Sequence, residues 1–375
     1  MDYSFAPGST PQDGRARRMF NRRADTTLIR ANGRRNTVRQ FIRHIATSGS
    51  ITRPVDDHLI ATHANSQGFL FIALFQGQNG ATRYETIQSA IDEPSKSIEI
   101  DDATIGYSAG DPITKAFHIK GCNIGRATPF LHKLKEALGD HVHVTAPKHF
   151  HYLFWLSRLG IFEGLSYEFN INRPTPFATR ADVLSAFQSG GFSFYDGSAI
   201  PNNEWNGWLP RRLSTNELKR RTRKSRALRI TLGTSVGQTN TLQADIGFRV
   251  TPNRFTYTIE YPNPGAVPGD TAGREAALNN TLNNDDTFDS SHDYPTYERW
   301  GYSSMADFIA GYTWTFAKNG NKLICRGRRY EYTVLPPIVD VSTGHFIFNF
   351  YPNSGSSHSP ITNLQVTDNQ FFETV

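Results

Sequence analysis

A histidine and a cysteine, His63 and Cys122, each follow a short apolar segment of the kind that forms a buried strand. His63 stands near the end of LIATHA at 59–64, and Cys122 ends AFHIKGC at 116–122. If the two strands are neighbours in a parallel sheet, both side chains rise from the carboxyl-terminal edge, where open α/β sheets bind their ligands. An imidazole beside a thiol supplies a general base and a nucleophile. The sequence therefore predicts a Cys-His pair suited to acyl transfer.

The backbone around this pair could stabilise an oxyanion. The N–H groups of Gly121, Cys122 and Ala64, the residue after the histidine, are the candidate donors. A helix predicted over 126–138 begins a few residues after Cys122, and the positive end of its dipole favours a thiolate.

The segments around the two residues alternate between strand and helix patterns. Helices are predicted from residue 37 and over 82–92 and 126–139, and strands over 58–64, 68–75, 115–122 and 141–147, with a turn at 65–68 joining the first two strands. Strands that alternate with helices in units of about 25–30 residues indicate an α/β layer with a largely parallel sheet.

Beyond about residue 165 the pattern changes to short alternating strands separated by turns, which predicts an antiparallel, β-rich region. The segments are 228–233, 245–250, 254–261, 311–318, 321–335 and 345–352. The first 27 residues have no apolar periodicity and are interpreted as a flexible basic arm. The expected organisation is a basic arm and short helix at 1–50, an α/β domain at 51–208, a basic linker or helix at 209–229 and a β-rich region at 230–375.

Three segments together resemble the caspase-like cysteine peptidases, in particular their CHAT-related bacterial branches. They are IATHANSQGFL at 60–70, HIKGCNIGRATPFLHKLKEALG at 118–139 and VHVTAP at 142–147. The resemblance implies a strand ending in the histidine, a hairpin, a helix, a strand ending in the cysteine, a helix and a strand. It also implies that His63 is the general acid or base and Cys122 the nucleophile. Family members usually have glycine where this chain has Ala64, which keeps the N–H group but avoids positive φ.

The resemblance further implies a regulated bacterial effector that cleaves a protein or peptide substrate through a thioester acyl-enzyme. Lys120, two residues before the cysteine, would then line the pocket for the residue preceding the cut. A lysine there favours an acidic or small neutral residue at that position. Acidic side chains of the preceding loop, Asp101, Asp102 or Asp111, would reverse this preference.

The positive charge is confined to two segments. The net charge is +6, but residues 1–44 carry +7 and residues 209–229 carry +8, which leaves −9 on the remainder. The second segment has three interpretations: a solvated helix face, a surface for nucleic acid or an acidic protein, and a linker cut during activation. The expected partner-binding residues are Arg211, Arg212, Lys219, Arg220, Arg221, Arg223 and Lys224. The alternative function is thus a catalytically inactive binding module.

Composition excludes several other classes. The sequence has no run of about 18 apolar residues and no apolar segment after its first charges, so a cytoplasmic protein without membrane partners is expected. Two cysteines are too few for a disulfide framework, and Cys325 lies in a strand pattern and is interpreted as structural. Glycine-rich phosphate loops are absent, and no carboxylate accompanies the histidines at 141, 143, 149 and 151 at zinc spacing. No metal or cofactor is expected.

Overall fold

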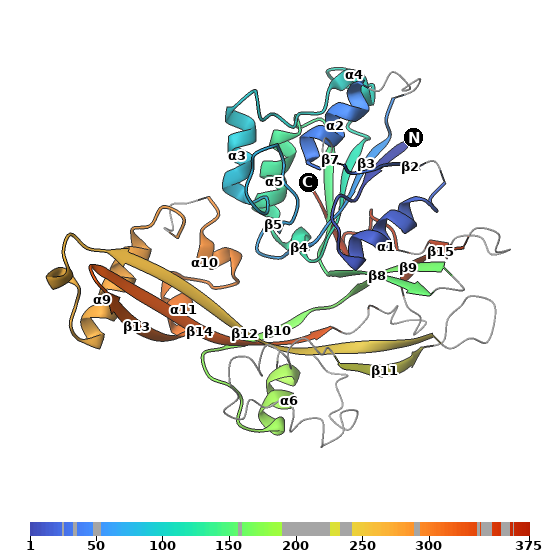
Figure 1. The fold of residues 1–375 in the computed structure, drawn as a ribbon. Helices are drawn as coiled ribbons and strands as arrows, with labels where there is room; N and C mark the ends of the chain where they lie inside the picture. The colour runs from blue at the N-terminus through green and yellow to red at the C-terminus, as the bar shows by residue number, and fades with distance from the viewer. Residues whose placement is uncertain are drawn as a thin grey trace. The chain divides into compact units, whose positions relative to one another are not determined.

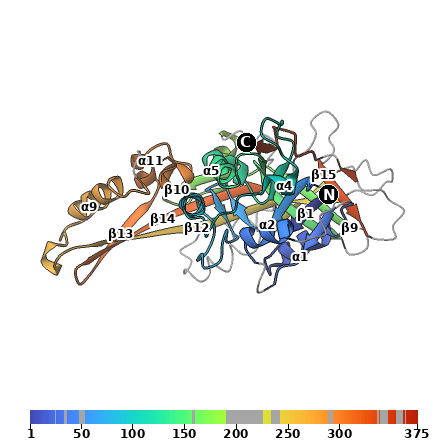
Figure 2. The same ribbon diagram turned by 90° about the horizontal axis from the view of Figure 1, so that it is seen from above.

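The computed structural model describes most of the chain, which divides into two compact units. The described residues are 1–24, 26–32, 36–47, 54–156, 160–189, 226–232, 242–288, 293–335, 338, 347–353, 361–362 and 364–375. Unit 1 comprises Met1–Ser166, Ile338–Asp340 and Phe346–Val375, and unit 2 comprises Tyr167–Pro337 and Val341–His345. Figure 1 and Figure 2 show the elements of both units in two views.

Unit 1 is built on a six-stranded sheet with the order β17-β7-β6-β3-β1-β2. The strands are β1 (Asp2–Phe5), β2 (Thr26–Ile29), β3 (Asp57–Ala61), β6 (Ala116–Lys120), β7 (His143–Pro147) and β17 (Phe372–Thr374). Strands β2, β1, β3, β6 and β7 pair with one another in parallel, and the edge strand β17 pairs with β7 in the antiparallel direction. The predicted α/β class with a largely parallel sheet is confirmed.

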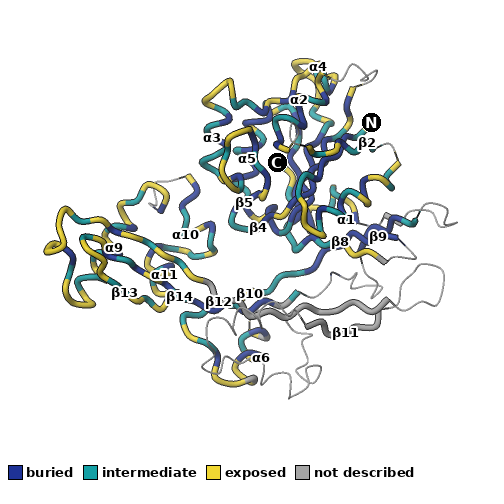
Figure 3. The backbone as a smooth tube through the Cα atoms, viewed as in Figure 1, coloured by how far each residue is buried: buried dark blue, intermediate teal, exposed yellow. Residues whose placement is uncertain are grey.

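Helices flank this sheet. They are α1 (Pro11–Phe20), α2 (Val38–Thr47), α3 (Tyr84–Asp92), α4 (Asp102–Ile105) and α5 (Thr128–Ala137), with a 3₁₀ turn η1 (Ile124–Arg126) before α5. The apolar residues of α2 recur at helical spacing, and Val38, Phe41 and Ile45 are buried. Figure 3 shows β1, β3, β6 and β7 as largely buried.

A smaller antiparallel sheet completes unit 1. It consists of β8 (Phe150–Leu156), β9 (Gly160–Ser166), β15 (Phe348–Pro352) and β16 (Ile361–Thr362), in the order β16-β15-β9-β8. Helix α1 packs against it through Met19 and Phe20, which share a core cluster with Leu153, Ile161 and Tyr351. A short hairpin of β4 (Ala64–Asn65) and β5 (Phe69–Leu70) follows β3.

Unit 2 contains a second antiparallel sheet, as the alternating pattern predicts. Its strands are β10 (Phe169–Arg173), β11 (Arg226–Leu232), β12 (Leu242–Glu260), β13 (Thr313–Asn319) and β14 (Lys322–Leu335). They have the order β10-β14-β12-β11, and β13 also pairs with β14. The helices are α6 (Arg180–Ser189), α9 (Thr271–Asn283), α10 (Thr296–Arg299) and α11 (Met305–Ala310), with the 3₁₀ turn η3 (Pro264–Ala266).

The interpretation of the N-terminus as a flexible arm is wrong for residues 1–24. Strand β1 lies inside the main sheet, between β2 and β3. Several arginines of this segment make internal contacts: Arg17 donates to the carbonyls of Ala6 and Gly8, and the Arg18 guanidinium lies over the Trp155 ring. A strand of four residues is too short to show a period, and this is why the pattern missed it.

Three further boundaries differ from the expected ones. The chain leaves unit 1 at Ser166 and returns at Ile338, so the expected division into domains at 51–208 and 230–375 is wrong. The apolar run at 68–75 is not one strand, because β5 ends at Leu70 and bends follow. Residues 226–228 belong to β11 and not to the helix considered for the basic block, whose residues 209–225 lie outside the described part of the chain.

Candidate functional site

Strands β3 and β6, which carry the predicted pair, are parallel neighbours. Ala61 is in register with Lys120, and the backbone N–H of Thr62 donates to the Lys120 carbonyl at 3.3 Å. His63 and Cys122 each come two residues after these register partners, on strands that lie about 4.8 Å apart in a regular sheet. The two residues therefore leave the sheet at adjacent positions of the same carboxyl-terminal edge.

The loops that follow the two strands pack closely at Gly121. A Cβ atom there would lie 2.7 Å from the Ala64 Cβ and 3.1 Å from the Thr62 carbonyl oxygen, so only glycine allows this approach. Ala64 does not need the conformation that glycine provides. Among the described residues, the non-glycine positions with positive φ are Asn123 and Asp140. The three candidate oxyanion donors, at 64, 121 and 122, thus come from two loops in contact.

Cys122 is half-buried, and its position is fixed by the segment that follows β7. Its Sγ donates to the backbone carbonyl of His151 at 3.2 Å, and the next N–H, that of Asn123, donates to the His149 carbonyl at 3.0 Å. A Cβ atom on Gly125 would lie 2.5 Å from the Ala146 carbonyl oxygen. The regular helix α5 begins at Thr128, later than predicted, so η1 separates it from Cys122.

His63 is exposed, and both its backbone carbonyl and its imidazole ring form hydrogen bonds. Its carbonyl accepts from the N–H of Phe71 at 2.8 Å. Its ring Nε2 lies 3.2 Å from the Thr10 Oγ1, and this hydroxyl lies 2.5 Å from the Asp13 Oδ2. Sequence reasoning missed Thr10 and Asp13, although Thr-Pro-x-Asp at 10–13 is a capping-box signal for the start of a helix.

Lys120, expected as a wall of the substrate pocket, is instead part of a buried ion pair. It is 4% exposed, and its Nζ lies 2.8 Å from the Oε1 of Glu163, which is fully buried. The same carboxylate accepts from His151 Nε2 at 3.1 Å, from Asn349 Nδ2 at 3.1 Å and from the Tyr351 hydroxyl at 3.0 Å.

The neighbours of the Glu163 carboxylate stabilise its ionised form. Burial alone would raise the pKa of Glu163, but the Lys120 ammonium and the His151 ring outweigh it and hold the pKa well below its usual range. Glu163 therefore neutralises Lys120, and the lysine offers no free charge with which to select an acidic substrate. Sequence reasoning missed Glu163, which lies 43 positions after Lys120 in the chain.

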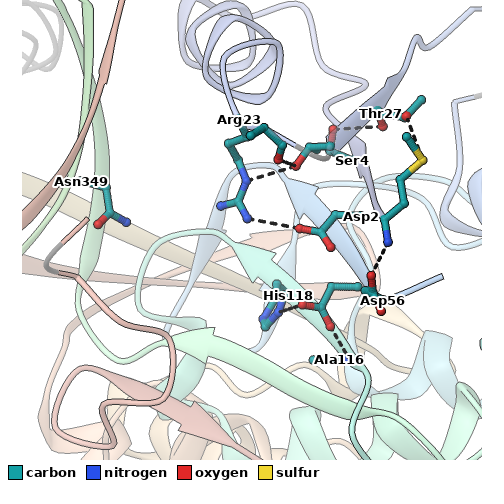
Figure 4. A network of polar contacts seen from close by, with 12 residues as sticks. Asp2, Ser4, Arg23, Thr27, Asp56, Ala116, His118 and Asn349 are labelled. Carbon is teal, nitrogen blue, oxygen red and sulfur yellow. Dashed lines mark hydrogen bonds and ion pairs between the residues drawn. The ribbon is translucent and has the colours of Figure 1, made fainter. Parts of the chain in front are cut away.

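A second polar cluster occupies the opposite, amino-terminal edge of the same sheet (Figure 4). Asp57 accepts from the N–H of Ala116 at 2.9 Å and lies 3.2 Å from His118 Nε2. Hydrogen bonds from Lys115 and the terminal amine lower the pKa of Asp56 to about 2. Its ion pairs join residues at or near the beginnings of β1, β3 and β6, so its contacts hold these strands together.

The histidines at 141, 143 and 149 and the second cysteine each have their own contacts. His141 lies 3.1 Å from Asp102, His143 contacts the Val375 carbonyl and His149 the Gln370 carbonyl. Within the described ranges, no three His, Cys, Asp or Glu side chains are grouped as metal ligands. Cys325 is fully buried in the core of unit 2, and burial raises the pKa of its thiol to about 11.

The expected partner-binding residues of the basic block lie outside the described residues. They are Arg211, Arg212, Lys219, Arg220, Arg221, Arg223 and Lys224. Of the helices in the described part of the chain, none has the length and apolarity to cross a membrane.

Comparison with known proteins gives no match. No protein-family model fits the sequence, and neither a curated protein nor a solved structure is significantly similar to the chain.

Proposed function

We propose that this protein is a caspase-like cysteine peptidase in which Cys122 is the nucleophile and His63 the general base. The observation that carries the proposal is the parallel pairing of β3 with β6, which brings the histidine loop and the cysteine loop to one edge of the sheet. Apart from the short helix α4 between α3 and β6 and the 3₁₀ turn η1 before α5, the element order β3, hairpin β4–β5, α3, β6, α5, β7 also follows the order that the resemblance implies.

The reaction follows from these positions. His63 accepts the proton of the Cys122 thiol, and the thiolate attacks the carbonyl carbon of a peptide bond. The N–H groups of Ala64, Gly121 and Cys122 are the donors available to the oxyanion of the tetrahedral intermediate. The intermediate collapses to a thioester as the C–N bond breaks, and the leaving amine takes its proton from His63. Water then hydrolyses the thioester and releases the thiol.

The substrate class we propose is a protein or peptide, and the biological setting that of a regulated bacterial effector. Because Glu163 neutralises Lys120, the preference for an acidic residue at the cleavage position loses its electrostatic basis. Phe71 is the most exposed large apolar side chain in the described part of the chain, at 54%, and its N–H binds the His63 carbonyl. We propose it as an apolar contact for a substrate side chain.

The test is covalent labelling with a peptidyl acyloxymethyl ketone, a carbonyl electrophile that requires an activated thiolate, followed by mapping of the modified residue. We expect the label on Cys122, its loss in Cys122→Ala and a strongly reduced rate in His63→Ala. Cys325→Ala is the matched control and should label as the natural chain does. Labelling of Cys325 instead, or an unchanged rate in His63→Ala, would overturn the proposal.

A further inference from the structure

We infer that Thr10 and Asp13 fix the tautomer of His63, so that Nε2 carries the hydrogen and Nδ1 is the atom that accepts a proton. This inference rests on the proposed function for its catalytic meaning. The geometry that supports it lies on α1 and on the loop before it, a segment that sequence reasoning had assigned to a flexible arm.

The argument begins with the single hydrogen of the Thr10 hydroxyl. An ionised carboxylate only accepts hydrogen bonds, whereas a hydroxyl donates one and accepts up to two. The Thr10 Oγ1 lies 2.5 Å from the Asp13 Oδ2, the shortest of the contacts around this hydroxyl, so its hydrogen points to Asp13. The same Oδ2 accepts from the Thr10 N–H at 2.8 Å.

The hydroxyl oxygen can therefore only accept from the histidine. Its distance to the His63 Nε2 is 3.2 Å, which is a hydrogen bond only if Nε2 carries the hydrogen. A neutral imidazole has one N–H, so Nδ1 keeps its lone pair. Nδ1 is then the base available to the thiol, and the imidazolium formed by proton transfer keeps its Nε2–H bond to the chain Thr10–Asp13.

The residues of the hydrogen-bond series His63–Thr10–Asp13 are held in place by the start of α1. Thr10 and Asp13 form the reciprocal capping box of α1, and Asp13 is buried. A Cβ atom on Gly8 would collide with the Asp13 carboxylate, so this loop closes directly over the acid. The loop itself continues from β1, a strand inside the sheet. Thr10 is thus a positioning residue, presented to the histidine by a fixed element.

The deciding experiment is ¹⁵N NMR of the histidine side chains in the full chain, with His63 assigned by its loss in His63→Gln. We expect the Nε2–H pattern for His63 in the natural protein and in Thr10→Ser, which keeps the hydroxyl. We expect a mixture of tautomers in Thr10→Val, which keeps the shape but lacks the donor and acceptor. An Nδ1–H pattern in the natural chain would overturn the inference even if Thr10→Val failed to fold.

The second readout is the rate of Cys122 alkylation by iodoacetamide at fixed pH, in a Cys325→Ala background. We expect Thr10→Val to lower this rate at least about tenfold and Thr10→Ser to restore it, since a well-oriented base contributes about 10²–10⁴-fold. Equal rates in both variants would count against the positioning role. If Cys122 is inert in every form while His63 keeps the Nε2–H tautomer, the proposed peptidase fails and the tautomer assignment stands.

Discussion

At the scale of single residues, the buried ion pair between Lys120 and Glu163 gives a structural partner to a charge that lies close to Cys122 in the sequence. Lys120 precedes Cys122 by two residues and shares its strand, yet its partner Glu163 comes from the smaller sheet. Four side chains meet on the Glu163 carboxylate, two from β15 and one each from β6 and β8. The network therefore ties the sheet that carries the cysteine to the sheet beside it.

Glu163→Gln is expected to destabilise unit 1 by about 3–5 kcal/mol, because it leaves the Lys120 ammonium buried without a counter-charge. The double variant Lys120→Met with Glu163→Gln should be less destabilised than Glu163→Gln alone, since no uncompensated charge remains. Urea unfolding of both variants measures the difference. If the double variant is the less stable of the two, the pair does not behave as a buried salt bridge.

A second residue, His58, makes the stability depend on pH. It is fully buried between the rings of Phe41 and Phe117, and neither ring nitrogen has a hydrogen-bond partner among the described residues. Burial lowers the pKa of His58 to about 4. Between about pH 6.5 and pH 4 the unfolded chain binds a proton here that the folded chain does not, so stability falls as the pH falls.

His58→Leu should remove this contribution, which reaches about 3 kcal/mol over the full pH window. The measurement is the free energy of unfolding of both proteins at pH 7 and at pH 4.5. We expect the natural chain to lose more stability than the variant over this interval. Equal losses would mean that His58 binds its proton equally well in the folded and the unfolded chain.

At the scale of elements, the contact between the histidine and cysteine loops depends on the missing side chain of Gly121. Gly121→Ala is expected to force the loops apart and to slow Cys122 labelling, with an overpacking cost of about 1–3 kcal/mol. Adding Ala64→Gly removes the nearer of the two clashes, at 2.7 Å, and should restore part of the rate. A Gly121→Ala variant that labels at the natural rate would mean that this approach does not set the geometry of the pair.

Sequence reasoning succeeded for those elements whose pattern is local. The helix at 38–47 and the strand before Cys122 follow from the spacing of their apolar residues. The strands that precede His63 and Cys122 are parallel neighbours, as the pattern predicts, and the catalytic pair itself stays a prediction. Sequence reasoning failed for β1, which is too short to show a period. It also failed for the run at 68–75, where most of the apolar side chains are buried although the backbone after Leu70 forms bends and not a strand. Thr10 and Glu163 were out of reach because they meet the site through contacts 53 and 43 positions apart.

At the scale of the whole molecule, unit 2 is an insertion within unit 1. The chain leaves after β9 and returns at Ile338, whose N–H donates to the Leu165 carbonyl at 3.0 Å. The strand β15 that follows then pairs with β9, and β17 closes the edge of the main sheet beside β7. Pairings between strands so distant in sequence leave no local trace, so a division into successive domains was the natural error.

Replacing residues 167–337 by a short Gly-Ser linker should therefore leave unit 1 folded, because the two cut ends are already adjacent. The remaining chain has about 200 residues, an ordinary size for one domain. We expect a single cooperative unfolding transition and a Cys122 alkylation rate close to that of the full chain.

A matched control combines the same replacement with truncation after residue 367, which removes β17. Phe371 and Phe372 are both buried, so this second chain should lose about 3–6 kcal/mol and the edge pairing of β7. If the chain lacking only 167–337 showed no cooperative transition, unit 1 would depend on unit 2 for its stability. If both chains unfolded alike, the returning C-terminal segment would not be part of the fold of unit 1. The two chains together therefore test whether the C-terminal strands, rather than unit 2, complete the sheet that presents His63 and Cys122.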